Sequence, residues 1–378
     1  MTTTRRDFLR KGTLATAAMA SMPALAQTTA TPQVTNGASP VTENETKTAR
    51  HTTFYLAAGP AGATPIVFVH GWPELSYSWR HQLPVMAGLG FRAIAPDMRG
   101  YGRSSSYTGL SDYAHEYAVN DMIELLDSIG GEKAIWVGHD WGAPVVFALA
   151  QHHPERCHGV AALCIPYMPD GFTAEHAMAL ADRNIYPEDK FPAAQWDYML
   201  FYHENFALAQ AQYEKNVRAT LRALFRGGNP AGKGRPARTY MVRANGGFFG
   251  PSVPLDMQRD PTVITEEDEN IYVAGLERNS FFGPLSWYMN DSANAAYAER
   301  AKNNWRLTMP VLFVHGAYDY VAQTLDSSLS APMRSNCANL TEATVFSGHW
   351  MAQEKPLALN AALAKWMAVQ FPILWPTP

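Results

Sequence analysis

The sequence predicts an α/β fold with a mostly parallel sheet and a helical insertion, and three observations lead to this prediction. Short apolar stretches suited to buried strands alternate with stretches of helical periodicity, first between residues 65 and 165 and again after residue 307. Such alternation is typical of parallel strands joined by crossover helices. Between residues 166 and 306 the strand-like stretches vanish, and helical stretches are joined by glycine- and proline-rich loops. The third observation is a sharp strand-to-helix turn at Asp140.

The elements follow from local patterns. Strands are expected where short apolar runs end at glycine, proline or polar residues, at 51–56 (an edge strand), 65–69, 91–95, 134–137, 159–165, 310–314 and 341–346. Helices are expected where apolar residues recur every three to four positions, at 76–88, 116–129, 143–150 and 356–369. The core therefore takes up residues 48–165 and 307–378, and residues 166–306 form a helical lid inserted after the strand that ends near Ile165.

The composition is that of a globular protein with no surface suited to nucleic acid. Hydrophobic residues make up 47% of the 378 positions, charged residues make up 17%, and the net charge is −4. The cysteines are Cys157, Cys164 and Cys337, an odd number without a C-x-x-C pair, so we expect neither a disulfide framework nor a metal site. A bridge between Cys157 and Cys164 is an alternative to two buried thiols.

The first 26 residues have the pattern of a twin-arginine signal peptide. Arg5 and Arg6 lie in a basic start, a mildly apolar run follows, and Ala24-Leu25-Ala26 is a small-residue cleavage site. The run is too short and too rich in alanine and threonine for stable membrane insertion. We therefore expect recognition by the twin-arginine export machinery and a periplasmic or secreted bacterial protein. Residues 27–47, rich in Thr, Pro, Asn and Ser, are expected to form a disordered tether.

The turn at Asp140 has the spacing of a nucleophile elbow. Gly138 and Gly142 flank Asp140 at two positions on either side, between a strand and an apolar helix. This motif usually carries serine. A carboxylate is already ionised at neutral pH and can displace a leaving group from saturated carbon, which gives an ester on the enzyme. The alternative is an aspartate that caps an ordinary helix.

Polar residues follow three further strands that lead toward the same edge of the sheet. His70-Gly71-Trp72-Pro73-Glu74 follows the strand at 65–69, and ligands bind beside such loops in open α/β sheets. We assign the oxyanion hole to the backbone N–H groups of Trp72 and Trp141 and expect a cis bond between Trp72 and Pro73.

Asp319 and His349 follow the last two strands. The order nucleophile, acid, histidine is the one that the elbow architecture requires, so Asp319 is expected to orient His349. Asp170 is the fallback acid. No H-E-x-x-H motif or Cys/His cluster supports a metal.

Two tyrosines stand out in the predicted lid. Tyr198 and Tyr288 each lie in an aromatic, otherwise apolar stretch. A buried tyrosine hydroxyl needs a hydrogen-bond partner, and two hydroxyls that converge on a cavity could donate to one developing oxyanion. Packed lid aromatics are the alternative reading of the same residues.

Taken together, these motifs resemble the α/β-hydrolase-fold epoxide hydrolases, the group that includes the C-terminal domain of mammalian soluble epoxide hydrolase. The resemblance covers residues from about 50 to 370 and is carried by residues 70–74, 138–142, 197–198, 283–288, 319 and 348–350. It implies that Tyr198 and Tyr288 hydrogen-bond the oxygen of a small-molecule epoxide while Asp140 opens the ring. Water then releases a vicinal diol, and no cofactor is implied. Met199 and Met289 depart from the family pattern, in which Gln and Arg are common.

Two alternatives remain at this point. A haloalkane dehalogenase uses the same Asp, His and acid but needs N–H donors for a halide, which Trp72 and Trp141 could supply. A secreted binding protein with a degenerate active site is the other alternative. The complete set of Asp140, Asp319 and His349 argues against it, because a binding protein has no need of all three.

Overall fold

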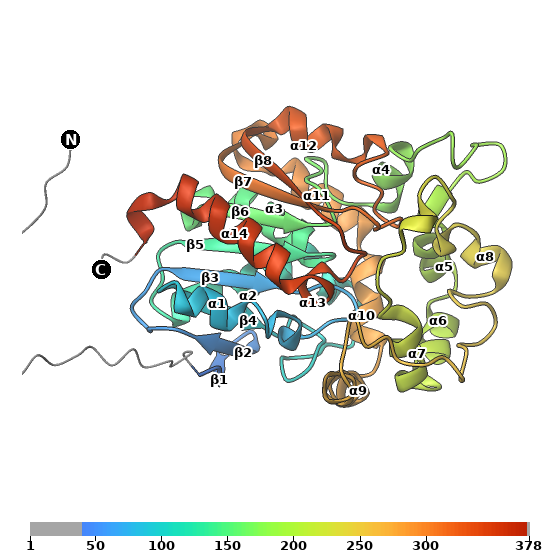
Figure 1. Cartoon of the computed structure of the whole chain (residues 1–378), viewed down its shortest axis with the longest axis horizontal. Helices are drawn as coiled ribbons and strands as arrows, with labels where there is room; N and C mark the ends of the chain where they lie inside the picture. Colours follow the sequence, from blue (N-terminus) through green and yellow to red (C-terminus); the bar gives the residue numbers. More distant parts are fainter. Residues whose placement is uncertain (1–39, 376–378) are drawn as a thin grey trace, which may run out of the picture. The chain divides into compact units, whose positions relative to one another are not determined.

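The computed structural model describes residues 40–375, and these residues are built around one eight-stranded sheet (Figure 1). The strand order is β1-β2-β4-β3-β5-β6-β7-β8. The strands are β1 (Thr42–Lys47), β2 (Thr52–Ala58), β3 (Pro65–Val69), β4 (Arg92–Pro96), β5 (Ala134–His139), β6 (Cys157–Leu163), β7 (Leu307–Gly316) and β8 (Cys337–Val345). From β4 to β8 neighbouring strands are parallel, whereas β1–β2 and β2–β4 are antiparallel. The predicted α/β fold with a mostly parallel sheet is confirmed.

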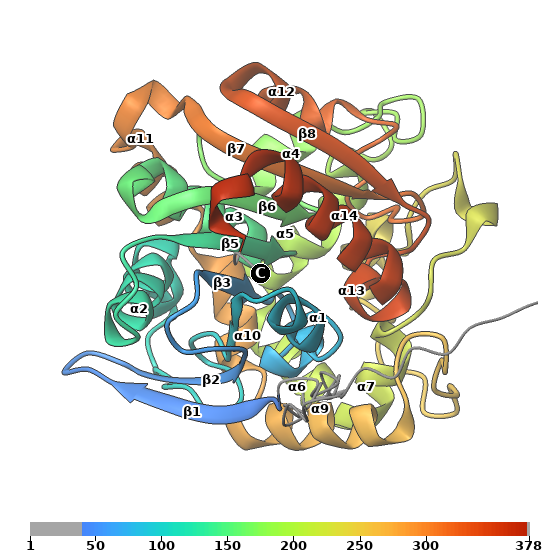
Figure 2. The same ribbon diagram turned by 60° about the vertical axis from the view of Figure 1, so that its left-hand side comes forward.

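Helices cover both faces of the sheet. Figure 2 shows α1 (Leu83–Gly88) and α14 (Pro356–Gln370) on one face, and α2 (His115–Ser128) and α3 (Gly142–His152) on the other. Every residue of β5 and of α3 is buried, as expected for elements enclosed on all sides. The helix predicted at 76–88 is interrupted: a 3-10 turn at Ser76–Trp79 precedes α1, whose first turn contains Pro84. Pro84 has no N–H to donate to a carbonyl in the preceding turn, so one continuous helix cannot pass through it. A new helix therefore begins at Leu83, with Pro84 in its first turn.

The predicted helical insertion lies between β6 and β7. In the described residues of this region the regular elements are helices, and no strand is formed. The α-helices are α4 (Ala174–Ala179), α5 (Asp197–Glu204), α6 (Phe206–Glu214), α7 (Val217–Leu224), α8 (Val242–Asn245), α9 (Glu266–Asn279), α10 (Phe282–Ser286) and α11 (Asp291–Glu299). Figure 1 shows α5 to α8 gathered beyond one end of the strands.

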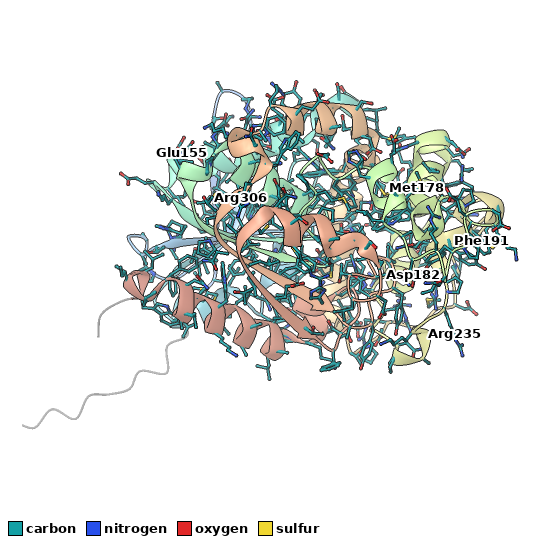
Figure 3. All side chains as sticks on the ribbon, turned by 90° about the horizontal axis from the view of Figure 1, so that it is seen from above. Glu155, Met178, Asp182, Phe191, Arg235 and Arg306 are labelled. Atoms are coloured by element: carbon teal, nitrogen blue, oxygen red, sulfur yellow. The ribbon has the colours of Figure 1, made fainter. Side chains whose placement is uncertain are left out.

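Part of this lid has a small apolar cluster of its own. Tyr186 and Ala194 are buried there, and Phe191 packs against them. In Figure 3, Phe191 and Arg235 lie on the lid, away from Glu155 of the core. Packing within the lid therefore stabilises this part of it, in addition to its contacts with the core.

The predicted boundary between tether and core is wrong by several residues. Residues 42–47 were expected to belong to the tether, but they form β1, which pairs with β2 from Thr42 opposite Ala57 to Lys47 opposite Thr52. The strand β2, predicted at the sheet edge, is therefore an interior strand. The polar sequence of β1 suits an exposed edge strand, where charged side chains discourage further pairing. The predicted signal peptide and the rest of the tether, up to residue 39, lie outside the described residues.

Two further expectations concern membranes and cysteines. Within residues 40–375, no helix has both the length and the apolar character that crossing a membrane requires. Cys157, Cys164 and Cys337 are all buried free thiols, so the alternative of a bridge between Cys157 and Cys164 is wrong.

Candidate active site

The turn at Asp140 has the strained geometry of a nucleophile elbow. Asp140 adopts a left-handed backbone with φ of 49°, which is uncommon for residues other than glycine. A Cβ on Gly142 would lie 2.1 Å from the carbonyl oxygen of Val69, and a Cβ on Gly138 would lie 2.4 Å from that of Gly142, so both positions require glycine. The capping position of α3 is occupied by Trp141, without a side-chain cap, so Asp140 is not a helix cap. The predicted strand-to-helix turn, with glycine at both flanking positions, is therefore present.

Asp140, His349 and Asp319 form one chain of polar contacts at the carboxyl ends of β5, β8 and β7. His349 Nε2 lies 3.4 Å from Asp140 Oδ2, and His349 Nδ1 lies 2.8 Å from Asp319 Oδ2. The backbone N–H groups of Val321 and Ala322 donate to the other oxygen of Asp319, at 3.2 and 3.3 Å. The predicted arrangement is found, and the fallback acid Asp170 is not needed.

The two carboxylates control the protonation of His349. Burial alone would lower the pKa of His349, but the charges and hydrogen bonds of Asp319 and Asp140 outweigh burial and raise the pKa well above its usual value. Burial alone would likewise raise the pKa of Asp319, but the neighbouring imidazolium holds it below the usual value. The two carboxylates therefore favour the protonated form of His349.

The oxyanion loop holds the second oxygen of the nucleophile. The backbone N–H of Trp72 donates to Asp140 Oδ1 at 2.8 Å, and the bond between Trp72 and Pro73 is cis, as predicted. Asp140 Oδ2 is thus the oxygen that faces His349, while Oδ1 is bound to the backbone of the oxyanion loop. Trp141, the other predicted donor, directly follows Asp140 at the start of α3.

The two predicted lid tyrosines lie together above Asp140. Tyr198 belongs to the first turn of α5, and Tyr288 belongs to a 3-10 turn after α10. Their rings are 5.8 Å apart between centroids, and both side chains are buried. Burial, together with the charge of Asp140, raises the pKa of both hydroxyls well above the usual value. Both hydroxyls therefore stay protonated and can act as hydrogen-bond donors.

The lid and the core enclose a cavity of about 360 Å³ around these groups. This size is at the lower end of ligand pockets. Its walls include Trp72, Asp140, Tyr198, Phe248, Tyr288 and His349. Met199 and Met289, which depart from the family pattern, are not among its lining residues.

A buried ion pair below the nucleophile is the main feature that sequence reasoning missed. His139 Nδ1 lies 2.6 Å from Glu74 Oε2, and both side chains are 1% exposed. His139 Nε2 lies 2.8 Å from the carbonyl oxygen of His349, and Gly71 N–H donates to Glu74. The pair therefore joins the loops after β3, β5 and β8. Both residues belong to the motifs quoted above, next to Asp140 and at the end of the oxyanion loop, but nothing in the sequence showed that they meet.

The structure also brings together a Cys/His cluster that the sequence did not indicate. Ligand atoms of His139, Cys164 and His349 lie within 4.8 Å of one another. The ring nitrogens of both histidines already contact Glu74, Asp319, Asp140 and the His349 carbonyl oxygen. A metal would have to displace these contacts, so we assign none to the cluster.

Comparisons with known proteins identify the family and the fold. Residues 64–356 match the model of the α/β-hydrolase fold family. The chain is 33% identical to epoxide hydrolase A of Mycobacterium tuberculosis over 82% of this chain and 92% of that protein. It is 32% identical to the pig bifunctional epoxide hydrolase 2, and the match covers 82% of this chain but 52% of that protein. A crystal structure of epoxide hydrolase A from Mycobacterium thermoresistibile superposes with a TM-score of 0.72 at 30% identity, over 87% of this chain and 98% of that one.

The ion pair between Glu74 and His139 makes part of the folding stability depend on pH. Burial opposes both charges, but each charge stabilises the other, so the pKa of His139 rises from 6.5 to about 10 and that of Glu74 falls from 4.5 to about 2. The histidine contribution is complete below pH 6.5 and is lost as the pH rises toward 10; the glutamate contribution is complete above pH 4.5 and is lost as the pH falls toward 2. We expect the pair to contribute most to stability between these two unshifted values.

A double-mutant cycle with Glu74→Gln and His139→Gln measures this contribution. Each single variant leaves one buried charge without its partner, so only the cycle isolates the pair. The coupling free energy from denaturant unfolding should be larger at about pH 5.5 than at about pH 9. A coupling energy that does not change with pH would contradict the assignment of a charged pair.

Proposed function

The chain belongs to the epoxide hydrolases of the α/β-hydrolase fold, and from this premise we propose that it hydrolyses an epoxide to a vicinal diol through a covalent ester on Asp140. The observation that carries the proposal is the convergence of a carboxylate, a histidine and two protonated tyrosine hydroxyls on one cavity. The substrates are a small-molecule epoxide and water, and the reaction as proposed needs no cofactor.

In the first half of the proposed reaction, Asp140 opens the epoxide ring. Oδ2 forms a bond to a ring carbon from the side opposite the ring oxygen, and the bond between that carbon and the oxygen breaks. The oxygen keeps the electron pair as an alkoxide, which the hydroxyls of Tyr198 and Tyr288 stabilise before it takes up a proton from the solvent. The product of this step is a hydroxyalkyl ester of Asp140.

In the second half, His349 activates water. Ester formation removes the negative charge of Asp140, so His349 loses one of the two carboxylates that raise its pKa and can release its proton to the solvent. This proton balances the one that the alkoxide took up. The neutral ring then takes a proton from water, and the hydroxide adds to the ester carbonyl carbon. Negative charge develops on Oδ1, to which the N–H of Trp72 already donates. We assign the second stabilising N–H to Trp141, which directly follows Asp140. Collapse of this intermediate breaks the ester bond, and the departing diol oxygen takes its proton from His349.

The dehalogenase alternative is not favoured. The relatives described above are epoxide hydrolases. Two lid hydroxyls also suit an alkoxide, which stays attached to the substrate, better than a halide that leaves. Release of halide from haloalkanes at rates like those of diol release from epoxides would reverse this preference.

Replacing the general base should trap the covalent intermediate. In His349→Gln the first half needs only Asp140 and the tyrosines, whereas the second half lacks its base. On incubation with epoxide, we expect mass spectrometry of the intact protein to show a gain equal to the whole epoxide. Asp140→Asn, alone or combined with His349→Gln, should show no gain. If His349→Gln gained no mass on incubation with epoxide, the proposed ester on Asp140 would be ruled out.

Removal of either lid hydroxyl should slow the first half. Tyr198→Phe and Tyr288→Phe keep the rings but remove one donor each, and loss of one such donor costs about a hundredfold to a thousandfold in rate. The rate of adduct formation in the His349→Gln background measures the effect. Tyr202→Phe is the matched control, because the Tyr202 hydroxyl is 2.5 Å from that of Tyr213 and the residue does not line the cavity. If the Tyr198→Phe/Tyr288→Phe double variant formed the adduct at the unaltered rate, the two tyrosines would serve only to pack the lid.

We further propose that the chain is exported by the twin-arginine machinery and acts in the periplasm or outside the cell. The support is the sequence of residues 1–26, with its paired arginines and its small-residue cleavage site. In a bacterial host, the mature protein should be found outside the cytoplasm and begin near Gln27. Replacing both Arg5 and Arg6 with lysine should leave the uncleaved precursor in the cytoplasm, as shown by fractionation and intact mass. Cleavage and export of this variant at the normal level would contradict the proposal.

A further inference from the structure

The lid touches the loop of the catalytic histidine through two glycines. Gly228 follows α7, and Gly348 directly precedes His349. A Cβ added to Gly228 would lie 2.3 Å from Gly348 N, and a Cβ added to Gly348 would lie 2.7 Å from Gly228 N. The two backbones are thus in direct contact, with no room for a side chain between them. Both glycines also line the reaction cavity.

One carboxylate oxygen binds both sides of this contact. Glu354, the last residue of α13 (Met351–Glu354), accepts the N–H of Gly348 at 2.8 Å and the N–H of Gly228 at 3.1 Å, both on Oε2. Hydrogen bonds to an ionised acceptor are about twice as strong as neutral ones. Glu354 therefore connects a lid segment to the residue beside the general base.

The residue on the other side of His349 is bound to the same lid segment. The indole N–H of Trp350 donates to the carbonyl oxygen of Leu224 at 2.9 Å, and its ring packs on Phe225 with centroids 4.4 Å apart. His349 thus lies between two residues that both contact residues 224–228. Displacement of this segment would remove a contact on each side of the catalytic ring.

We propose that Glu354 is a positioning residue that makes the placement of His349 depend on the seated lid. The inference rests on the proposed function, in which the second half-reaction alone needs His349. Ring opening uses Asp140 and the two tyrosines, none of which Glu354 contacts in the described residues. Loss of the Glu354 contacts should therefore slow ester hydrolysis selectively, because a small misplacement of a catalytic group costs up to about a hundredfold in rate.

A matched control separates this role from simple anchoring of the lid. Asp260 accepts the N–H of Gly227 at 3.0 Å, so it holds the same lid segment one residue earlier. Its hydrogen bonds in the described part of the chain go to the lid, at Gly227 and Thr262, and not to the His349 loop. Asp260→Ala therefore weakens the lid segment without removing the carboxylate that binds Gly348.

The two half-reactions are measured separately with styrene oxide as the probe. Each variant is mixed with excess epoxide and quenched in acid at short times, and the mass of the intact protein gives the rate of adduct formation. The epoxide is then removed, and the loss of the added mass over time gives the rate of adduct decay. In Glu354→Ala we expect adduct formation at the wild-type rate and decay slowed by about tenfold to a hundredfold. Glu354→Gln should recover most of the decay rate, since its amide oxygen can accept the same N–H groups. Asp260→Ala should slow the decay much less than Glu354→Ala, because Glu354 still binds both Gly228 and Gly348 in this variant.

A second variant tests the same contact with Glu354 intact. Gly228→Ala places a Cβ where the backbone of Gly348 lies, so it pushes the two segments apart and should slow adduct decay in the same selective way. This variant also provides the test if Glu354→Ala does not fold. The inference would be overturned if Glu354→Ala slowed both half-reactions equally or left the adduct decay unchanged. It would also be overturned if Asp260→Ala slowed the decay as much as Glu354→Ala does. A failed proposed function is recognised separately, because then His349→Gln would form no adduct.

Discussion

The left-handed backbone of Asp140 is the constraint on which the rest of the site depends. Such a conformation persists only where the surroundings determine it, and here they do so by contact between backbones. A Cβ on Gly71 would lie 2.5 Å from Asp140 Cβ, and one on Gly142 would touch the carbonyl group of Val69. The oxyanion loop after β3 and the turn after β5 therefore pack without intervening side chains. The nucleophile and the N–H that binds its oxygen are consequently fixed relative to each other by the two neighbouring strands.

The buried pair of Glu74 and His139 reinforces this arrangement electrostatically. A buried charge without a partner is costly, so the two residues hold each other in place, and His139 also contacts the carbonyl oxygen of His349. The loops after β3 and β8 are thereby joined to the end of β5. Tyr198 and Tyr288, in contrast, belong to the lid. The position of their hydroxyls relative to Asp140 therefore depends on how the lid packs on the core.

The sequence predicts the parts of the site that are fixed by local pattern and strand order. The glycines around Asp140 mark the elbow, and Asp319 and His349 could be placed beside it because the carboxyl ends of parallel strands meet at one edge. β1 escaped prediction because its residues, TENETK, have no apolar face, and its pairing with the strand predicted at 51–56 is visible only in space. The pairs formed by Glu74 with His139 and by Glu354 with Gly228 and Gly348 were missed for a related reason. Contacts between distant polar residues have no periodic signal.

In the proposed reaction, tyrosine suits the role of lid donor because Asp140 is the nucleophile and carries a negative charge. A lysine or a protonated histidine at the positions of Tyr198 or Tyr288 would form an ion pair with the carboxylate of Asp140 and stabilise it before reaction. Tyrosine avoids this ground-state cost, because burial and the neighbouring carboxylate keep its hydroxyl neutral and protonated. A neutral donor interacts much more strongly with a developing alkoxide than with an epoxide oxygen. In the proposed reaction, the lid would therefore stabilise the transition state more than the bound substrate, which is the condition for an increase in rate.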